Sequence, residues 1–392
     1  MFVLVIFVTA MLAVALELLA RLLWTPPDGL AAIVAMPLWH EPAPGHIEPL
    51  PGFTGKFQEA PPQNLPPSAA FTPRILDIAI NSAGLRGDEL GDKSAAERRV
   101  LFGGDSLTFG HGVAAAESFP ERTAAELTTG DRRIRACNAG VPGFGFQLTC
   151  RRLAWLRERT AADALVAAYF LGNDFVDHIE QLSACVVAGR MFQGGAGNLM
   201  QNHWRGRFAV HSRAWLFVES WLLQTRPSSS LVQALLQATP EQALRRSALP
   251  AGKTIGGLFL DADPGHSFAP AAPPVVTLWL QDLEATLTGL RTTAAGRPLL
   301  VLVLPTRFHV DAKLRAAVLA ESGLDGLRLQ LGAAQRRVAE LCDRLGIDCL
   351  DATPTLAAMD AGAWAQDHIH MSATGNTAVA KALAVRLLPK LR

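Results

Sequence analysis

The stretch Val100-Leu-Phe-Gly-Gly-Asp-Ser-Leu107 decides the fold, because an apolar run ends there in two glycines and a polar turn. The run predicts a buried strand, and Ser106 stands where that strand turns into a helix. Further apolar runs alternate with amphipathic stretches, which predicts a parallel sheet with helices on both faces. The expected strands cover residues 99–103, 134–138, 164–171, 299–304 and 347–350. The expected helices cover residues 118–127, 147–160, 276–293, 327–345 and 373–388.

These elements predict an α/β fold with about five parallel strands. A flavodoxin-like strand order, 2-1-3-4-5, would bring the loops after the first and third strands together. Residues 177–274 interrupt the alternation and are expected to form a mostly helical or irregular insertion. Within it, residues 211–223 are apolar around most of a helix. That segment is expected to pack on the core or, alternatively, against a membrane surface or an acyl chain.

Polar residues follow the expected strands at their carboxyl ends, where open parallel sheets bind ligands. Ser106 follows the first strand, Gly143 the second and Asn173 the third. Asp367 and His370 lie between the last strand and the closing helix. The sequence therefore predicts that these residues meet in one site.

The residue types at this site suit acyl chemistry at a serine. A serine hydroxyl is a poor nucleophile until a base removes its proton, and His370 is the candidate base for Ser106. Asp367 lies three residues before His370 and is expected to orient its imidazole. The backbone N–H groups of Ser106 and Gly143 and the side-chain amide of Asn173 are the candidate oxyanion donors. This chemistry requires neither a metal nor an organic cofactor.

The motifs resemble those of a known family. Gly104-Asp-Ser-Leu107, Gly143, Gly172-Asn-Asp174 and Asp367-x-x-His370 are similar, in this order, to the four blocks of the SGNH, or GDSL-type, hydrolases. The resemblance covers about residues 80–388. It implies a three-layer α/β/α fold with esterase, lipase, deacetylase or acyltransferase activity. It also implies the four namesake roles for Ser106, Gly143, Asn173 and His370.

A lead-in segment and two departures accompany these blocks. Asn81-Ser-Ala-Gly-Leu-Arg-Gly87 resembles the lead-in of membrane-anchored bacterial members, with Leu85 where Phe is expected. Met371 stands where many relatives have Trp, which leaves the acyl pocket undefined. Arg86 is expected either to tie the lead-in to the core or to bind a carboxylate or sugar.

Other polar residues near the blocks have two interpretations. Asp105, Asp174 and His111 are possible substrate-binding residues. The alternative for Asp105 and Asp174 is local hydrogen bonding, and the same two interpretations apply to Asp177 and His178. The alternative for His111 is a loop position without a role in binding. His368, inside the last block, is expected to face solvent.

The N-terminal residues 1–24 predict a membrane anchor, because they are almost continuously apolar over about the 20 residues that a spanning helix needs. Glu17 and Arg21 can pair at its end. The alternative is a cleaved signal peptide, since Ala13-Val-Ala15 resembles a cleavage site, but no positively charged segment precedes the apolar run. The proline-rich residues 25–75 predict an extended spacer, and residues 76–392 the hydrolase domain. These features predict a single-pass inner-membrane protein with its catalytic domain on the outer face, or a secreted one after cleavage.

Composition excludes some classes of protein. With 18% charged residues and a net charge of +1, the 392-residue chain shows neither a nucleic-acid surface nor a disordered composition. Its cysteines have no metal-ligand spacing and are expected to be small buried side chains. They are Cys137, Cys150, Cys185, Cys342 and Cys349. The sequence does not decide whether the last two form a disulfide.

Three functions remain in view. The first is a serine esterase that acts on acylated envelope or exported glycans or other acyl esters. The second is a polysaccharide O-acyltransferase that uses the same triad. The third is a non-catalytic glycan-binding subunit of an envelope assembly, for which a damaged triad would be the natural signature.

Overall fold

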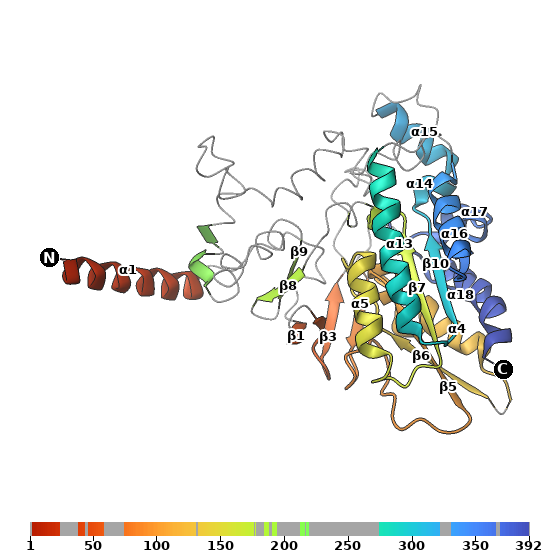
Figure 1. Ribbon diagram of the computed structural model, residues 1–392, viewed down its shortest axis with the longest axis horizontal. Coiled ribbons are helices and arrows are strands. Elements are labelled where there is room, and N and C mark those ends of the chain that lie inside the picture. The colour runs from red at the N-terminus through yellow and green to blue at the C-terminus, as the bar shows by residue number, and fades with distance from the viewer. Residues whose placement is uncertain are drawn as a thin grey trace.

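A five-stranded parallel sheet forms the centre of the molecule (Figure 1). The computed structural model describes residues 2–23, 38–43, 46–58, 74–130, 132–175, 177, 184–187, 190–193, 212–215, 217–218, 274–321, 331–365 and 369–391. The strands are β5 (Glu97–Gly103), β6 (Arg133–Asn138), β7 (Ala164–Phe170), β10 (Leu299–Leu304) and β11 (Asp348–Asp351). Their spatial order is β6-β5-β7-β10-β11, which is 2-1-3-4-5 when counted along the chain. All neighbours pair in parallel, so the predicted parallel α/β sheet is confirmed.

Helices cover both faces of the sheet, because successive residues of each strand point to opposite sides. One face carries Leu101, Leu165 and Val301 against α5 (Phe146–Leu156), α13 (Pro274–Ala294) and α16 (Ala333–Arg344). The other carries Phe102, Val166 and Leu302 against α4 (Phe119–Leu127) and α18 (Ala373–Leu387). Figure 1 shows α5 and α13 side by side over one face of the sheet. The result is a three-layer α/β/α arrangement with an apolar core on each side.

Short elements lie between these layers. They are α3 (Ser106–Phe109), α14 (Arg307–Val310), α15 (Ala312–Glu321) and α17 (Thr353–Ala357), with 3-10 turns at Ala115–Glu117, Asp360–Ala363 and Leu388–Lys390. Sequence periodicity did not predict α14 and α17, because segments of 4 and 5 residues carry too few turns to show an apolar stripe. It did not predict α15 because the apolar residues of that helix do not gather on one side.

The proline-rich segment before the core is partly folded, which corrects the extended spacer expected over residues 25–75. The strands β1 (Trp39–Ala43) and β2 (His46–Pro49) form one antiparallel hairpin. The strands β3 (Thr54–Gln58) and β4 (Ile75–Ala79) form another antiparallel pair. Trp39, Ile47 and Phe57 are buried in a third apolar cluster together with Phe109 and Phe144 of the core domain. Apolar residues between the prolines provide this cluster, and proline is tolerated in edge strands and turns.

The insertion is described only in part. It contains an antiparallel hairpin, β8 (Ala184–Val187) and β9 (Arg190–Gln193), where the sequence predicted mostly helical or irregular structure. Alternation of apolar residues over such short strands is too brief to distinguish from a loop. Most of residues 177–274, including much of the apolar segment 211–223, lies outside the described residues.

The N-terminal helix α1 (Phe2–Leu23) contacts the described part of that apolar segment. The Glu17 carboxylate accepts hydrogen bonds from Ser212 Oγ and from the backbone N–H groups of Arg213 and Ala214, at 2.8–3.1 Å. It also pairs with Arg21 at 2.7 Å, as the spacing predicted.

Of the helices within the described residues, none combines the length and the apolar character needed to cross a membrane.

Four cysteines, Cys137, Cys150, Cys342 and Cys349, are free thiols, and the first three are buried. The side chain of Cys185 lies outside the described residues.

Candidate active site

Ser106 is the first residue of α3, directly after the end of β5. Asp105 caps this helix, since its Oδ1 accepts a hydrogen bond of 2.9 Å from the backbone N–H of Leu107. The turn requires glycine at position 104, because a Cβ there would overlap Thr108 Oγ1. The chain therefore turns sharply from a buried strand and leaves Ser106 half-buried at the carboxyl edge of the sheet.

His370 meets Ser106 although 264 residues separate them: Nε2 lies 2.8 Å from Ser106 Oγ. The residue is buried, with 9% of its surface exposed. Two backbone contacts fix the loop that carries it. The carbonyl of His370 accepts a 2.8 Å hydrogen bond from Ala365 N, and Met371 bridges to Trp364. This pair can pass a proton from a serine hydroxyl to an imidazole.

Asp367, the predicted orienting acid, lies outside the described residues, as does His368. The contact expected between Asp367 and the second ring nitrogen of His370 therefore stays a prediction.

The predicted oxyanion donors lie on the loops that flank the Ser106 turn. β6 and β7 are the two neighbours of β5 in the sheet, and Gly143 and Asn173 follow them. Gly143 has φ +81°, which favours glycine. The Asn173 amide donates to Asp177 Oδ2 at 2.6 Å, which orients the side chain. The donor roles of Gly143 and Asn173 stay predictions.

Buried carboxyl groups underlie this turn. Burial raises the pKa of Asp105 to about 6, while the Leu107 N–H and the charge of His370 lower it. Burial, with the neighbouring charges of Asp105 and Asp177, also raises the pKa of Asp174 well above its ordinary value. Oδ2 of the Asp174 carboxyl group accepts a 2.7 Å hydrogen bond from the backbone N–H of Phe170. Both candidates for substrate contact, Asp105 and Asp174, thus bind local backbone, which favours the structural alternative.

Arg86 ties the lead-in segment to the core, as one of its two interpretations expected. Its guanidinium donates to the carbonyl oxygens of Phe109, Gly110 and Val113 at 2.6–2.7 Å. Burial lowers its pKa to about 10, and the charge of Glu121 opposes this shift. The acceptors lie at the last residue of α3 and in the loop after it, so Arg86 holds the segment that follows Ser106.

The lead-in motif itself forms a turn that presents Arg86. Asn81 Oδ1 accepts hydrogen bonds from the N–H groups of Ala83 and Leu85, and Gly84 adopts φ +73°. Leu85, where the family pattern has Phe, is buried in the core. Arg86 then pairs with Asn138 at the end of β6.

The contact of His111 with His370 was not predicted from the sequence, which gave His111 only as a possible substrate-binding residue or a loop residue. Its ring lies against that of His370, with centroids 4.2 Å apart and an interplanar angle of 32°. No spacing rule links the two residues, because the contact depends on how the loop after α3 folds back. The flanking Gly110 and Gly112 were the available signal.

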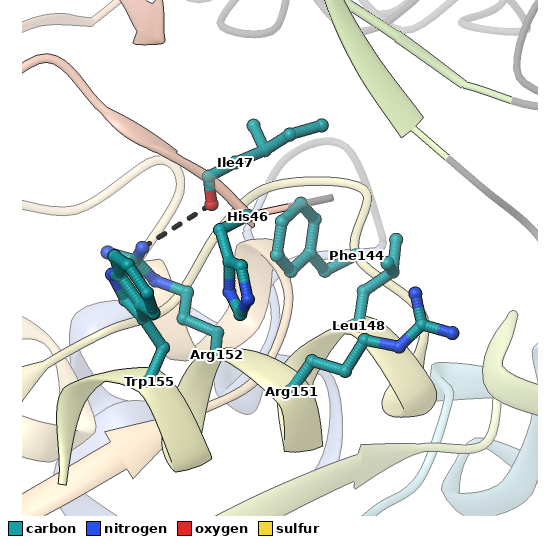
Figure 2. A pocket seen from close by; sticks show the side chains of 7 residues that line it. All are labelled: His46, Ile47, Phe144, Leu148, Arg151, Arg152 and Trp155. Carbon is teal, nitrogen blue, oxygen red and sulfur yellow. Dashed lines mark hydrogen bonds between the residues drawn. The ribbon is translucent and has the colours of Figure 1, made fainter. Parts of the chain in front are cut away.

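A shallow recess lies on another part of the surface (Figure 2). It lies between β2 and α5, is open to solvent, and is lined by His46, Ile47, Phe144, Leu148, Arg151, Arg152 and Trp155. Neither Ser106 nor His370 lines it. The His46 ring stacks on Trp155 with centroids 4.3 Å apart, and Arg152 donates to Ile47 O. These contacts hold the N-terminal hairpin on α5, so the recess belongs to a packing interface.

Metal ligation has no candidate in the described part of the chain, where no group of three His, Cys, Asp or Glu side chains converges.

Comparisons with known proteins give structural likeness without sequence support. No family model matches the sequence, and no curated protein matches it. The chain is similar to a member of the lipolytic protein G-D-S-L family from Veillonella parvula DSM 2008, with TM-score 0.36 and 12% identity over 75% of this chain and 100% of that one. It is also similar to the lipase Lip_vut3 from a goat rumen metagenome, with TM-score 0.38 and 12% identity over 75% and 99%. The M. smegmatis aryl esterase gives TM-score 0.33 and 13% identity over 75% and 100%. TM-scores this low support no functional conclusion. The function proposed below is argued from the residues of the chain's own site.

Proposed function

We propose that this protein is a serine ester hydrolase of the SGNH type. The observation that carries the proposal is the 2.8 Å contact between Ser106 Oγ and His370 Nε2, at the carboxyl edge of a parallel sheet. A serine on a sharp strand-to-helix turn, paired with a histidine from a distant loop, is the arrangement that acyl transfer requires.

In the acylation step, Ser106 Oγ attacks the carbonyl carbon of the ester while its proton passes to His370 Nε2. The carbonyl oxygen becomes an oxyanion, for which Ser106 N–H, Gly143 N–H and the Asn173 amide are the proposed donors. The intermediate collapses, the C–O bond to the alcohol breaks, and the alcohol leaves with the proton from His370. The products of this step are an acyl-serine and a free alcohol.

In the second step, a water molecule gives a proton to His370 and attacks the acyl carbon. The bond to Ser106 Oγ then breaks, Oγ recovers the proton, and the carboxylic acid leaves. Asp367 is proposed to hold the imidazole in the tautomer that receives the Ser106 proton, and to stabilise the imidazolium.

The substrate class proposed from the sequence is an O-acylated glycan of the envelope or an exported polysaccharide. If a sugar hydroxyl replaces water in the second step, the same acyl-serine gives transfer in place of hydrolysis. Acetylated oligosaccharide, incubated with and without an acceptor glycan, separates the two: acetate release indicates hydrolysis, and acylated acceptor indicates transfer.

The location also stays a proposal drawn from the sequence, with residues 1–24 as an inner-membrane anchor and the catalytic domain outside. Fractionation of cells that express the full chain, compared with a chain that begins at Leu38, tests it. Recovery of the full chain in the soluble fraction without shortening would contradict it.

The hydrolase proposal is tested with short- and long-chain p-nitrophenyl esters and the Ser106→Ala variant as control. We expect turnover by the natural chain and none by the variant. Equal turnover by both would contradict the proposal.

A further inference from the structure

The loop between α3 and the 3-10 turn at Ala115–Glu117 presents a second histidine to the catalytic pair. His111 stands between Gly110 and Gly112, whose φ values of +85° and +79° favour glycine. Its ring centroid lies 4.2 Å from that of His370, and the two planes are 32° apart. A second imidazole therefore covers one side of the proposed base.

The loop is held by two guanidinium groups. Arg86 binds the carbonyl oxygens of Phe109, Gly110 and Val113, and Arg74 donates to Gly112 O at 2.8 Å. The backbone N–H of His111 donates to Ser106 O at 2.9 Å. Backbone hydrogen bonds thus fix His111 relative to the helix that starts at Ser106.

The His111 ring is also packed from the N-terminal region. Phe57, a buried residue of β3, lies with its ring centroid 4.8 Å from that of His111 at an angle of 60°. β3 pairs with β4, and Arg74 directly precedes β4. The same antiparallel pair therefore contacts the His111 ring and holds its loop.

We propose that His111 is a positioning residue, whose ring holds the imidazole of His370 with Nε2 directed at Ser106 Oγ. The inference rests on the proposed function, since it assigns His111 a role in the action of that base. The torsion about the bond to an imidazole ring is broad, so a hydrogen bond at one edge does not by itself fix the ring plane. Packing of the His111 ring against that of His370 adds a restraint on the ring plane.

The restraint has a kinetic consequence. A displacement of about 1 Å at a reacting group can cost about 100-fold in rate. Because His111 acts through its ring, a phenyl group at the same position supplies the same restraint. Direct contact of His111 with substrate or proton transfer by its nitrogens would instead require the imidazole.

The test compares His111→Ala and His111→Phe in the full chain, with His46→Ala as a matched control. His46 also makes a ring contact, with Trp155 of α5, in the recess that neither Ser106 nor His370 lines. For each protein, kcat and KM are measured on a p-nitrophenyl ester, and thermal unfolding is followed by circular dichroism. A second measurement records the Hε1 resonance of His370 by NMR, with assignment from a His370→Gln variant.

We expect His111→Ala to lower kcat about 10- to 100-fold with KM unchanged. We expect His111→Phe to keep kcat within about threefold, as the control does. Unchanged kcat in His111→Ala, or a loss that appears only in KM, would overturn the proposal. A loss in His111→Phe of more than about tenfold would also overturn it, even if His111→Ala does not fold.

The NMR measurement separates failure of this inference from failure of the hydrolase proposal. If the natural chain turns over no ester, the hydrolase proposal fails. The chemical shift of His370 Hε1 still reports the ring contact. It is expected to change in His111→Ala, which loses the neighbouring ring, and to keep the effect of a neighbouring ring in His111→Phe. An unchanged resonance in His111→Ala would overturn the positioning role whatever the activity.

Discussion

The carboxyl edge of the parallel sheet and the N-terminal antiparallel strands contribute to the same site in different ways. The edge carries Ser106 and His370, which contact each other directly. The N-terminal strands and the lead-in carry Phe57, Arg74 and Arg86, which contact the loop beside that pair. The difference predicts two kinds of variant. Replacement of Ser106 or His370 at the edge should lower the rate and leave stability nearly unchanged, whereas changes in the N-terminal region should lower stability.

Removal of the base gives the largest expected effect. His370→Ala should lower kcat by roughly 10⁴- to 10⁶-fold, as loss of a triad member does elsewhere. The midpoint of thermal unfolding should change little, because the loop keeps its backbone contacts at Ala365 and Trp364. Ester turnover and circular dichroism check the two parts. A variant that retains a tenth of the activity would mean that the edge does not act as proposed.

Loss of Arg86 tests the other region. Arg86→Ala removes three hydrogen bonds from a charged donor, and the carbonyl oxygens of Phe109 and Gly110 keep only longer contacts of 3.2–3.3 Å. We expect it to lower the free energy of unfolding by about 3–5 kcal/mol, measured by urea denaturation. Arg386→Ala is the control, since that side chain is 50% exposed and should change stability by about 0.5 kcal/mol or less. Equal stability of the two variants would show that Arg86 does not hold the loop.

The proposed oxyanion donors lie at the carboxyl edge of the sheet. Asn173→Ala should raise the activation free energy by about 2.7–4 kcal/mol, which appears in kcat. Loss of the partner in Asp177→Ala should lower kcat less, because the Asn173 amide remains and loses only the contact that orients it. Steady-state kinetics on one ester decides the order. A larger loss in Asp177→Ala than in Asn173→Ala would contradict the donor assignment.

Replacement of Asp105 gives the smallest expected effect on the free energy of unfolding, and this effect depends on pH. Burial raises its pKa from 3.8 to about 6, so the folded state binds the proton more tightly than the unfolded state. Its contribution to stability is therefore complete below pH 3.8 and is lost as the pH rises through about 6. The loss amounts to about 3 kcal/mol or less.

Asp105→Asn keeps an acceptor for the Leu107 N–H and removes the titration. The difference in unfolding free energy between Asp105→Asn and the natural chain should therefore grow in favour of the variant as the pH rises from 4 to 7. A difference in unfolding free energy that stays constant from pH 4 to 7 would contradict the raised pKa of Asp105.

The sequence predicted the edge of the sheet better than the region that supports it. Apolar runs such as Val100-Leu-Phe102 are long enough to indicate buried strands, and they predicted the parallel sheet. Ser106 and His370 could be proposed as a nucleophile and base from motifs that lie at fixed places relative to the regular elements. The structure brings the two side chains into contact, and their catalytic roles stay a proposal.

The N-terminal strands could not be predicted in the same way. Prolines interrupt residues 38–58, so neither a period of two nor a helical stripe develops there, although Trp39 and Phe57 are buried. The placement of His111 against His370 depends on tertiary hydrogen bonds from Arg74 and Arg86, which leave no local pattern in the sequence. Asp367 and most of the insertion lie outside the described residues, and the predictions made for them stand.

Covalent labelling of Ser106 tests the central claim most directly. The full chain is incubated with a fluorophosphonate, and the labelled peptide is identified by mass spectrometry, with Ser106→Ala and His370→Ala in parallel. The account predicts one label, on Ser106, which is absent from Ser106→Ala and forms much more slowly in His370→Ala. Absence of label from the natural chain, or equal labelling of Ser106→Ala, would contradict the claim that Ser106 is a nucleophile activated by His370.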